Sequence, residues 1–234
     1  MLALGSLKVL RRSSVEKLSG AYDTQAAGLP RGRTSLLTEE TRDKQRRRLV
    51  KAAISAFAEK GFTATTITDI VKRARVSKQV FYEIFENKED CFLAADDLGR
   101  KALYEQVLTG IQVESLHDDH WIRSSLRAYL QLCVNEQEFT KAWAIEFPNA
   151  GRRCLEQHNI FFEELGKTLK SIHNVIKIKQ PEQWVTVPDL FYDAAIGGAY
   201  GIIFRYICQN RFDELLDLED DLVHFIQFSI GFKK

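Results

Sequence analysis

Residues 66–85 read TITDIVKRARVSKQVFYEIF, and this stretch decides the fold. Thr66 followed three residues later by Asp69 is a variant of the capping box that begins a helix. The pattern predicts a short helix from Thr66 to Ala74 and then a three-residue turn. Ser77 closes that turn and can cap a second short helix, which runs to the end of the stretch. Two short helices with this spacing form a helix-turn-helix.

The second helix is too short to be stable alone, so packing must hold it in place. A long amphipathic helix is predicted just before it, over residues 42–60, with Gly61 where that helix ends. The apolar side chains that would pack the short helices against the long one are Ile67, Ile70, Val71, Val76, Val80, Phe81 and Phe85. The opposite face carries the polar side chains of Ser77, Lys78, Gln79, Tyr82 and Glu83.

A helix exposed in this way fits the DNA major groove with its first residues at the base edges. Lys78 can donate to guanine or to a phosphate, and Gln79 can pair with adenine. Thr65 and Thr66 precede the first short helix, where hydroxyls, free backbone N–H groups and the helix dipole favour a phosphate. Lys88, at the start of the next helix, can do likewise. The alternative is a pair of ordinary core helices with solvated charges.

The charge distribution favours the first interpretation. The chain of 234 residues has a net charge of only +1. Residues 1–91 nevertheless carry 18 Lys and Arg against 11 Asp and Glu, a balance of +7. The remaining residues carry 15 and 21, a balance of −6. A basic front and an acidic rear indicate that the front faces a polyanion.

Residues 44–95 resemble the TetR family of transcriptional regulators. The resemblance rests on EKGF at residues 59–62, TT at 65–66, VSK at 76–78 and FYEIFENKE at 81–89. It implies an all-α fold in which a three-helix DNA-binding domain precedes a larger helical domain for ligand binding and dimerisation. It also implies DNA contacts by Thr66, Lys78, Gln79, Tyr82 and Lys88, with Tyr82 and Lys88 on phosphates.

Two positions depart from the family pattern. Relatives usually carry glycine in the turn where this chain has Arg75, and a left-handed backbone there is mildly strained for arginine. Ile84 occupies a position where histidine is common, which removes one phosphate contact or packing hydrogen bond.

The first 40 residues are expected to form a flexible basic arm. Pro30-Arg31-Gly32-Arg33 resembles the core of an AT-hook, in which arginines enter a narrow A·T minor groove. Further basic side chains, among them Arg47, follow on the first long helix. We predict that Arg33 and Arg47 contact DNA, against the alternative of a solvated linker and a solvated helix face.

Three domains are therefore expected: the arm over residues 1–40, the helix-turn-helix over 41–90, and a helical ligand-binding and dimerisation domain over 91–234. Helices in the last are predicted near residues 119–137, 139–147, 151–178, 188–210 and 214–230. Aromatic side chains are concentrated there, so we expect a pocket for a small hydrophobic or aromatic effector. Most are core side chains at helical spacing; the candidates for the pocket are Trp121, Tyr129, Trp143, Phe147, Phe162 and Tyr192.

The last two predicted helices have the character of a dimer surface. Gly197, Gly198 and Gly201 permit close helix approach, and each costs about 1 kcal/mol in a helix interior, so they need a packing reason. The candidate interface residues are Phe191, Ala195, Gly198, Ile202, Leu222 and Phe225. An intramolecular core is the alternative. A two-fold homodimer would present its recognition helices to a palindromic operator.

The sequence contains no Gly-rich phosphate loop, His-Glu-x-x-His or Gly-x-Ser-x-Gly motif, so we expect no enzyme and no cofactor. His117-Asp118-Asp119-His120 could reach a metal, but capping at a loop-to-helix junction is the simpler interpretation, and we predict no metal site. Four dispersed cysteines, no membrane span and no signal peptide indicate a cytoplasmic protein. We expect a ligand-relieved repressor; an activator, a ligand-independent DNA-binding protein and, last, a small helical enzyme stay open.

Overall fold

The structure is a computed structural model that describes residues 17–21, 39–110 and 120–233. Regular structure in these residues is helical, apart from a single bridge between Trp184 and Phe232. The fold is therefore all-α, as the helical periodicity predicts. None of the helices in the described residues is long and apolar enough to cross a bilayer.

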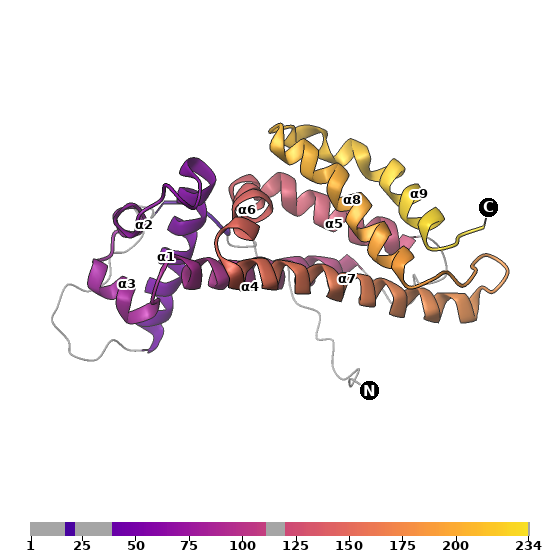
Figure 1. Cartoon of the computed structure of the whole chain (residues 1–234), viewed down its shortest axis with the longest axis horizontal. Coiled ribbons are helices and arrows are strands. Elements are labelled where there is room, and N and C mark those ends of the chain that lie inside the picture. Colours follow the sequence, from indigo (N-terminus) through magenta and orange to yellow (C-terminus); the bar gives the residue numbers. More distant parts are fainter. Residues whose placement is uncertain (1–16, 22–38, 111–119, 234) are drawn as a thin grey trace.

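Three helices form one end of the molecule: α1 (Glu39–Lys60), α2 (Ile67–Ala74) and α3 (Lys78–Ile84). α4 (Lys88–Gly110) leads away from them into a larger helical part (Figure 1). The order continues with α5 (His120–Asn135), α6 (Gln137–Lys141), α7 (Arg152–Lys179), α8 (Leu190–Cys208) and α9 (Glu219–Ser229). The domain boundary predicted at residue 90 lies inside α4, which is continuous there. The boundary therefore stays a prediction.

The predicted helices are present, with differences at three places. α1 begins at Glu39 rather than at residue 42. The predicted helix over 139–147 is divided into α6, a π-helix (Ala142–Glu146) and a 3-10 helix (Phe147–Asn149). Pro148 lacks a backbone N–H, which prevents the helix from continuing. The last predicted helix is a 3-10 helix (Phe212–Leu218) followed by α9.

One hydrophobic cluster joins the two ends of the molecule and runs from α1–α3 to α9. It includes Leu18, whose side chain is buried and whose backbone N–H donates to Glu136 Oε2 over 3.1 Å. The expectation of a flexible arm over the first 40 residues is therefore wrong at this point, because a leucine in an apolar site and a satisfied N–H fix the chain there.

Candidate nucleic-acid interface and sensor cavity

The N-terminus of α2 is closed by the predicted capping box. Asp69 N–H donates to Thr66 Oγ1 over 3.2 Å, and Thr66 N–H donates to Asp69 Oδ2 over 2.9 Å. Lys60 Nζ lies 2.8 Å from Asp69 Oδ1, and its hydrogen bond, with those of Thr66, lowers the pKa of Asp69. Thr66 remains exposed, so the backbone N–H groups beyond it face outward at a helix N-terminus that suits a phosphate.

Thr65 was predicted beside Thr66 as a phosphate contact, and the structure corrects this. Its side chain is buried, and Thr65 Oγ1 donates to the carbonyl oxygens of Gly61 (2.7 Å) and Ala56 (3.2 Å). The hydroxyl therefore closes the C-terminal end of α1, where carbonyl groups have no intrahelical partner. The sequence could not separate these roles, because adjacent threonines look equivalent before the turn is folded.

The turn between α2 and α3 contains the strain expected from the sequence. Arg75 adopts a left-handed backbone with φ 52° and ψ 48°. Its N–H donates to the Lys72 carbonyl over 3.3 Å, and the Val76 N–H donates to the Val71 carbonyl over 3.1 Å. These two bonds close the C-terminus of α2 and turn the chain towards α3.

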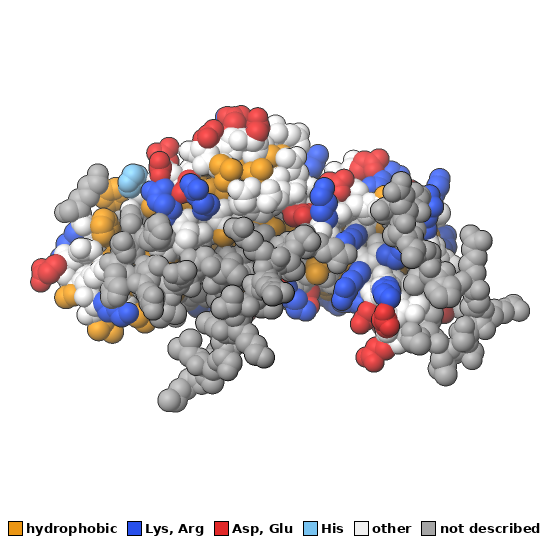
Figure 2. All heavy atoms as spheres, turned by 180° about the vertical axis from the view of Figure 1, so that it is seen from behind, with side chains coloured by type: hydrophobic (Ala, Val, Ile, Leu, Met, Phe, Trp, Pro, Cys, Tyr) orange, Lys and Arg blue, Asp and Glu red, His pale blue; other side chains and the backbone are white. Residues whose placement is uncertain are grey.

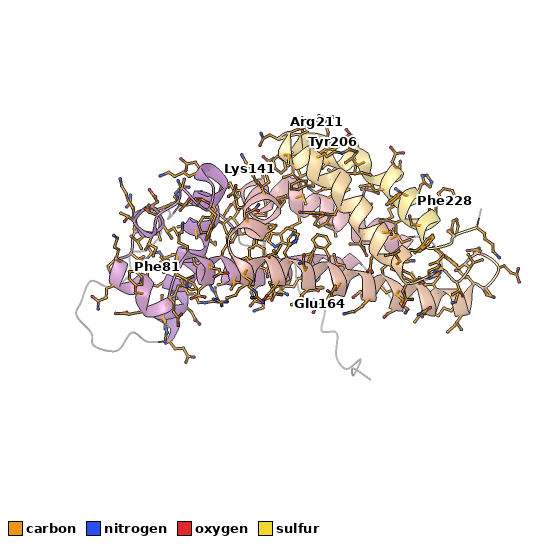
Figure 3. The ribbon with its side chains drawn as sticks, viewed as in Figure 1. Phe81, Lys141, Glu164, Tyr206, Arg211 and Phe228 are labelled. Carbon is orange, nitrogen blue, oxygen red and sulfur yellow. The ribbon has the colours of Figure 1, made fainter. Side chains whose placement is uncertain are left out.

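α3 presents the predicted polar face. Its inner face buries Phe81 and, at the helix end, Phe85, while Ser77 Oγ caps its first turn by accepting from Val80 N–H. Figure 3 labels Phe81 on this helix. The predicted contact residues on the outer face are all exposed: Ser77, Lys78, Gln79 and Tyr82. Tyr82 is 58% exposed, a large value for an aromatic side chain, so its hydroxyl is open to a ligand.

Basic residues of α1 fix the orientation of α3. An Arg42 guanidinium nitrogen donates to the Glu83 carbonyl over 3.1 Å, and the Arg46 guanidinium lies 5.8 Å from the centre of the Phe85 ring. Arg47 is exposed beside them, whereas Arg33 lies outside the described residues. On the face shown in Figure 2, several Lys and Arg side chains lie over the α1–α3 end of the molecule.

Lys88 takes a different place from the predicted one. Its Nζ donates to the carbonyl oxygens of Phe62 (2.8 Å) and Thr65 (2.6 Å) and lies 4.5 Å from the centre of the Phe62 ring. Burial lowers the pKa of Lys88. The ammonium thus holds the α1–α2 turn, so its main role is internal rather than that of a freely presented phosphate ligand.

A small cavity of about 30 Å³ lies in the larger helical part. Of the predicted ligand-binding residues, Tyr129 and Trp143 line it. Phe162 packs behind Trp143, with ring centres 6.1 Å apart. Trp121, Phe147 and Tyr192 are buried and do not line this cavity, so their assignment to the effector pocket stays a prediction. At helical spacing, an aromatic that fills the core cannot be told from one that lines a pocket.

The other residues that line the cavity were not predicted from the sequence as ligand-binding residues: Gly99, Arg100, Leu103, Leu132, Cys133, Phe139, Thr140, Ala144 and Phe161. A close contact at Gly99 could have been predicted, because a glycine inside a helix needs a packing reason. Here the reason is Phe139, since a Cβ atom at Gly99 would collide with its ring. Behind the cavity Trp143 Nε1 donates to Asp96 Oδ1 over 2.8 Å, and burial raises the pKa of Asp96.

The predicted interface residues divide into two groups. Ala195 and Leu222 are buried within the chain, so their assignment to a dimer surface is wrong. Phe191 and Phe225 are exposed, and Gly198 and Ile202 are half-buried. The inner stripe of α8 and α9 thus packs into the chain's own core, and a second stripe faces outward. The described residues contain no group of side chains that could hold a metal ion, and residues 117–119 lie outside them.

Comparison with known proteins agrees with this geometry. Residues 49–95 match the family model of bacterial regulatory proteins of the tetR family. The chain is 42% identical over 53 residues to the HTH-type transcriptional regulator YerO of Bacillus subtilis, itself uncharacterised. This match covers 23% of the chain and only 18% of YerO.

Solved structures share the fold over most of the chain. The FadR regulator of Bacillus subtilis, in complex with stearoyl-CoA, has a TM-score of 0.64 at 15% identity and covers 79% of this chain and 98% of its own. A tetR family regulatory protein from Rhodococcus RHA1 has a TM-score of 0.65 at 15% identity, with coverages of 82% and 99%. The family match and the packed α2–α3 pair lead to one conclusion: residues 49–95 form a helix-turn-helix of the kind found in bacterial regulatory proteins of the tetR family, and the chain as a whole shares its fold with the solved regulators.

Proposed function

We propose that this chain represses transcription by binding a palindromic operator as a homodimer, and that a small apolar or aromatic effector relieves the repression. The observation that carries the proposal is the outer face of α3. Lys78, Gln79 and Tyr82 are exposed on a helix whose opposite face is fixed by the buried Phe81. A rigid helix with exposed polar side chains at its start suits a major groove.

The glycines of α8 support the homodimer. A Cβ atom at Gly198 would lie 2.6 Å from the Phe225 ring, so packing within the chain explains that glycine. A Cβ atom at Gly197 or Gly201 would meet nothing within 4 Å, and both residues are exposed. Each costs about 1 kcal/mol in a helix, and the close approach of a second α8 offsets that cost.

Further exposed apolar side chains lie on α8 and α9. Leu190 is 72% exposed, Phe191 46% and Phe228 55%. Figure 3 labels Phe228 on α9. We define the dimer face as Leu190, Phe191, Gly197, Gly201, Phe225 and Phe228. An apolar surface of this kind is unfavourable in water and becomes favourable when two copies bury it.

The cavity supports the effector. Its walls are mainly apolar and aromatic, with Arg100 at its edge. FadR of Bacillus subtilis binds stearoyl-CoA, which supports an effector with an extended apolar part for this chain as well. A volume of about 30 Å³ holds little more than a water molecule, whereas ligand pockets measure roughly 300–1,000 Å³. Binding must therefore open the cavity and move its walls.

Effector binding is expected to shift the equilibrium between two conformations of the protein rather than to act on the DNA directly. α4 begins at Lys88, which holds the α1–α2 turn, and continues past Gly99, Arg100 and Leu103 in the cavity wall. An effector that favours the opened cavity favours a conformation whose recognition helices are wrongly spaced for two half-sites. If the protein is an activator or binds DNA independently of a ligand, the effector should not lower its affinity for DNA in this way.

The arm is proposed to add sequence-tolerant affinity through Arg31 and Arg33. Because Leu18 is docked on the protein, substitution of both arginines by alanine is a cleaner test than deletion of the arm. A smaller salt slope of DNA binding in the substituted protein supports the contact, and an unchanged slope contradicts it.

The proposal is tested by titrating the protein onto DNA from its own upstream region, with a random duplex as control. Specific binding at a palindrome, with two chains per site by light scattering, is the expected result. A small-molecule extract of the source cells should release the protein from the palindrome. Binding that shows no sequence preference would contradict the repressor, and binding that no extract relieves would contradict the effector.

A further inference from the structure

The turn between α1 and α2 is held by two side chains from outside the helix-turn-helix. Lys88 of α4 donates to the carbonyls of Phe62 and Thr65. Glu146 Oε2 accepts from the Phe62 N–H over 2.7 Å. The Lys88 ammonium therefore binds the carbonyl groups of this segment, and the Glu146 carboxylate binds its N–H group. Any movement of either side chain changes the direction in which α2, and with it α3, leaves α1.

Glu146 belongs to the segment that forms the cavity wall. Phe139, Thr140, Trp143 and Ala144 line the cavity, and Glu146 follows two residues later. Glu146 itself is half-buried and does not line the cavity, and its carboxylate accepts from the Phe62 N–H. One short segment thus lies against the cavity with one part and against the DNA-binding helices with another.

A series of neighbouring aromatic rings connects the cavity wall to the α1–α2 turn. Trp143 lies 6.4 Å from Phe147 between ring centres, Phe147 lies 5.0 Å from Phe92, and Phe92 lies 5.9 Å from Phe62 and 4.5 Å from Phe57. Phe92 and Phe147 are essentially fully buried. Close-packed interiors transmit a displacement because they contain no free volume to absorb it. A shift of Trp143 therefore reaches the ring of the residue whose N–H is held by Glu146.

The segment between cavity and carboxylate is the π-helix Ala142–Glu146, in which the Phe147 N–H donates to the Ala142 carbonyl. Each hydrogen bond of a π-helix spans one residue more than an α-helical bond, and such segments are rare and frequently found at functional sites. Return to α-helical bonding changes the register by one residue and rotates the following side chains about the axis. α-helical bonding would be the second discrete arrangement of this segment, and a switch requires two such arrangements.

The position of Glu146 is unfavourable as a simple helix cap. Its carboxylate lies at the C-terminal end of α1, beside Gly61, where the helix dipole repels an anion. A cation or a neutral side chain would stabilise that end better. The bond to Phe62 N–H compensates in this conformation only, so loss of the bond releases Glu146 readily.

We propose that the π-helix of residues 142–146 is the switch that couples the cavity to the recognition helix: opening the cavity at Phe139 and Trp143 shifts the π-helix and withdraws Glu146 from the Phe62 N–H. This inference rests on the proposed function and adds to it a route that is separate from α4. Without the bond, Lys88 is the one remaining contact to the α1–α2 turn of the two described above from outside the helix-turn-helix, and the orientation of α3 is less tightly fixed.

A substitution inside the cavity can stand in for the unidentified effector. In Gly99→Ala the new Cβ collides with the outer ring atoms of Phe139 and pushes that wall away. Gly99→Ala/Phe139→Leu is the matched control, because leucine lacks the ring atoms that collide. Cys133→Met adds volume at another lining residue and replaces Gly99→Ala if that variant does not fold. Glu146→Ala removes the carboxylate, and Glu146→Gln keeps an oxygen that can accept from Phe62.

The test is a double-mutant cycle of operator affinity in the full-length dimer. Gly99→Ala and Glu146→Ala should each weaken binding about tenfold, Glu146→Gln less than about threefold, and the Phe139→Leu control should restore the affinity of Gly99→Ala. In the Glu146→Ala background Gly99→Ala should change affinity less than about twofold, because the bond it breaks is already absent. Effects that multiply would overturn the proposal.

A second readout separates the switch from a general loss of structure. Amide exchange by NMR should show faster exchange at Phe62 in Gly99→Ala, while Thr65 N–H, which donates to Gly61 O, keeps its protection. Equal protection of Phe62 in wild type and variant contradicts the proposal. Absence of operator binding by the wild-type protein would instead refute the proposed function, so the two failures are distinguishable.

Discussion

Lys88 Nζ lies 2.8 Å from the carbonyl oxygen of Phe62 and 4.5 Å from the centre of the Phe62 ring. One side chain of α4 therefore contacts both the backbone and the aromatic ring of the turn that leads to α2. The DNA-binding helices do not form a detached module, since their geometry depends on a residue that begins the long helix to the cavity.

Replacing Lys88 by methionine should destabilise the protein by about 1–2 kcal/mol, because two carbonyl groups lose a charged donor. Chemical denaturation measures this. Operator affinity should fall without a change in the salt slope. A slope that falls by about one with unchanged stability would show that Lys88 contacts a phosphate instead.

Replacing Tyr82 by phenylalanine should weaken binding to operator and random DNA by similar factors, because the family resemblance assigns its exposed hydroxyl to a phosphate and phosphate contacts do not depend on base sequence. Fluorescence anisotropy with both duplexes measures the two affinities. Stability should not change, since the side chain is 58% exposed. A loss confined to the operator would assign Tyr82 to base recognition.

Replacing Arg75 by glycine should stabilise the fold by about 0.5–1 kcal/mol, because glycine adopts the left-handed backbone at φ 52° without strain. Thermal unfolding of Arg75→Gly and Arg75→Asn, compared with wild type, measures the gain. Asparagine, which tolerates this conformation, should give part of it. Lower stability for both variants would show that the arginine side chain outweighs the backbone strain.

Replacing Gly197 or Gly201 by leucine should convert the proposed homodimer to a monomer, because each new side chain would project from the proposed dimer face, where a second copy has to approach. Light scattering gives the mass. Lys167→Leu on exposed α7 is the control and should leave the dimer intact. Gly198→Ala should lower stability through its contact with Phe225. A stable dimer in both leucine variants would place the interface elsewhere.

Stability should fall as the pH drops below about 6.5. His158 packs between Trp143 and Phe162, its buried Nε2 has no hydrogen-bond partner among the described residues, and burial lowers its pKa from 6.5. The unfolded state then binds the proton more readily, so the stabilisation present above pH 6.5 is lost as the pH falls towards the folded pKa.

Thermal unfolding between pH 5 and 8 measures this dependence, which His158→Phe should reduce. His173, also buried and with a lowered pKa, should account for what remains. An unchanged pH profile in His158→Phe would mean that the imidazole is protonated equally in both states.

The helix-turn-helix could be predicted from the sequence because its signals are local. Thr66 with Asp69, Ser77, and the spacing of Phe81 and Phe85 each act within one or two turns of helix, and even the strained backbone at Arg75 follows from the missing glycine. Such features depend on neighbours along the chain rather than on the tertiary fold.

The remaining features depend on contacts between distant residues. Nothing near Thr65 or Lys88 in the sequence indicates that one is buried and the other donates to the α1–α2 turn. The π-helix has no local breaker before Pro148, and Gly99 is explained only once Phe139 lies on it. Ala195 and Leu222 share a periodicity with exposed neighbours, so only the packed helices separate core from surface.

α3 is the helix that we propose recognises the operator, and one measurement tests this role most directly. Affinities of wild type and Lys78→Ala/Gln79→Ala are compared on the operator and on a random duplex at the same salt concentration. We predict that the variant loses at least about tenfold more affinity for the operator than for random DNA, with an unchanged melting temperature. Equal affinities for the operator would contradict the assignment of α3 as the recognition helix.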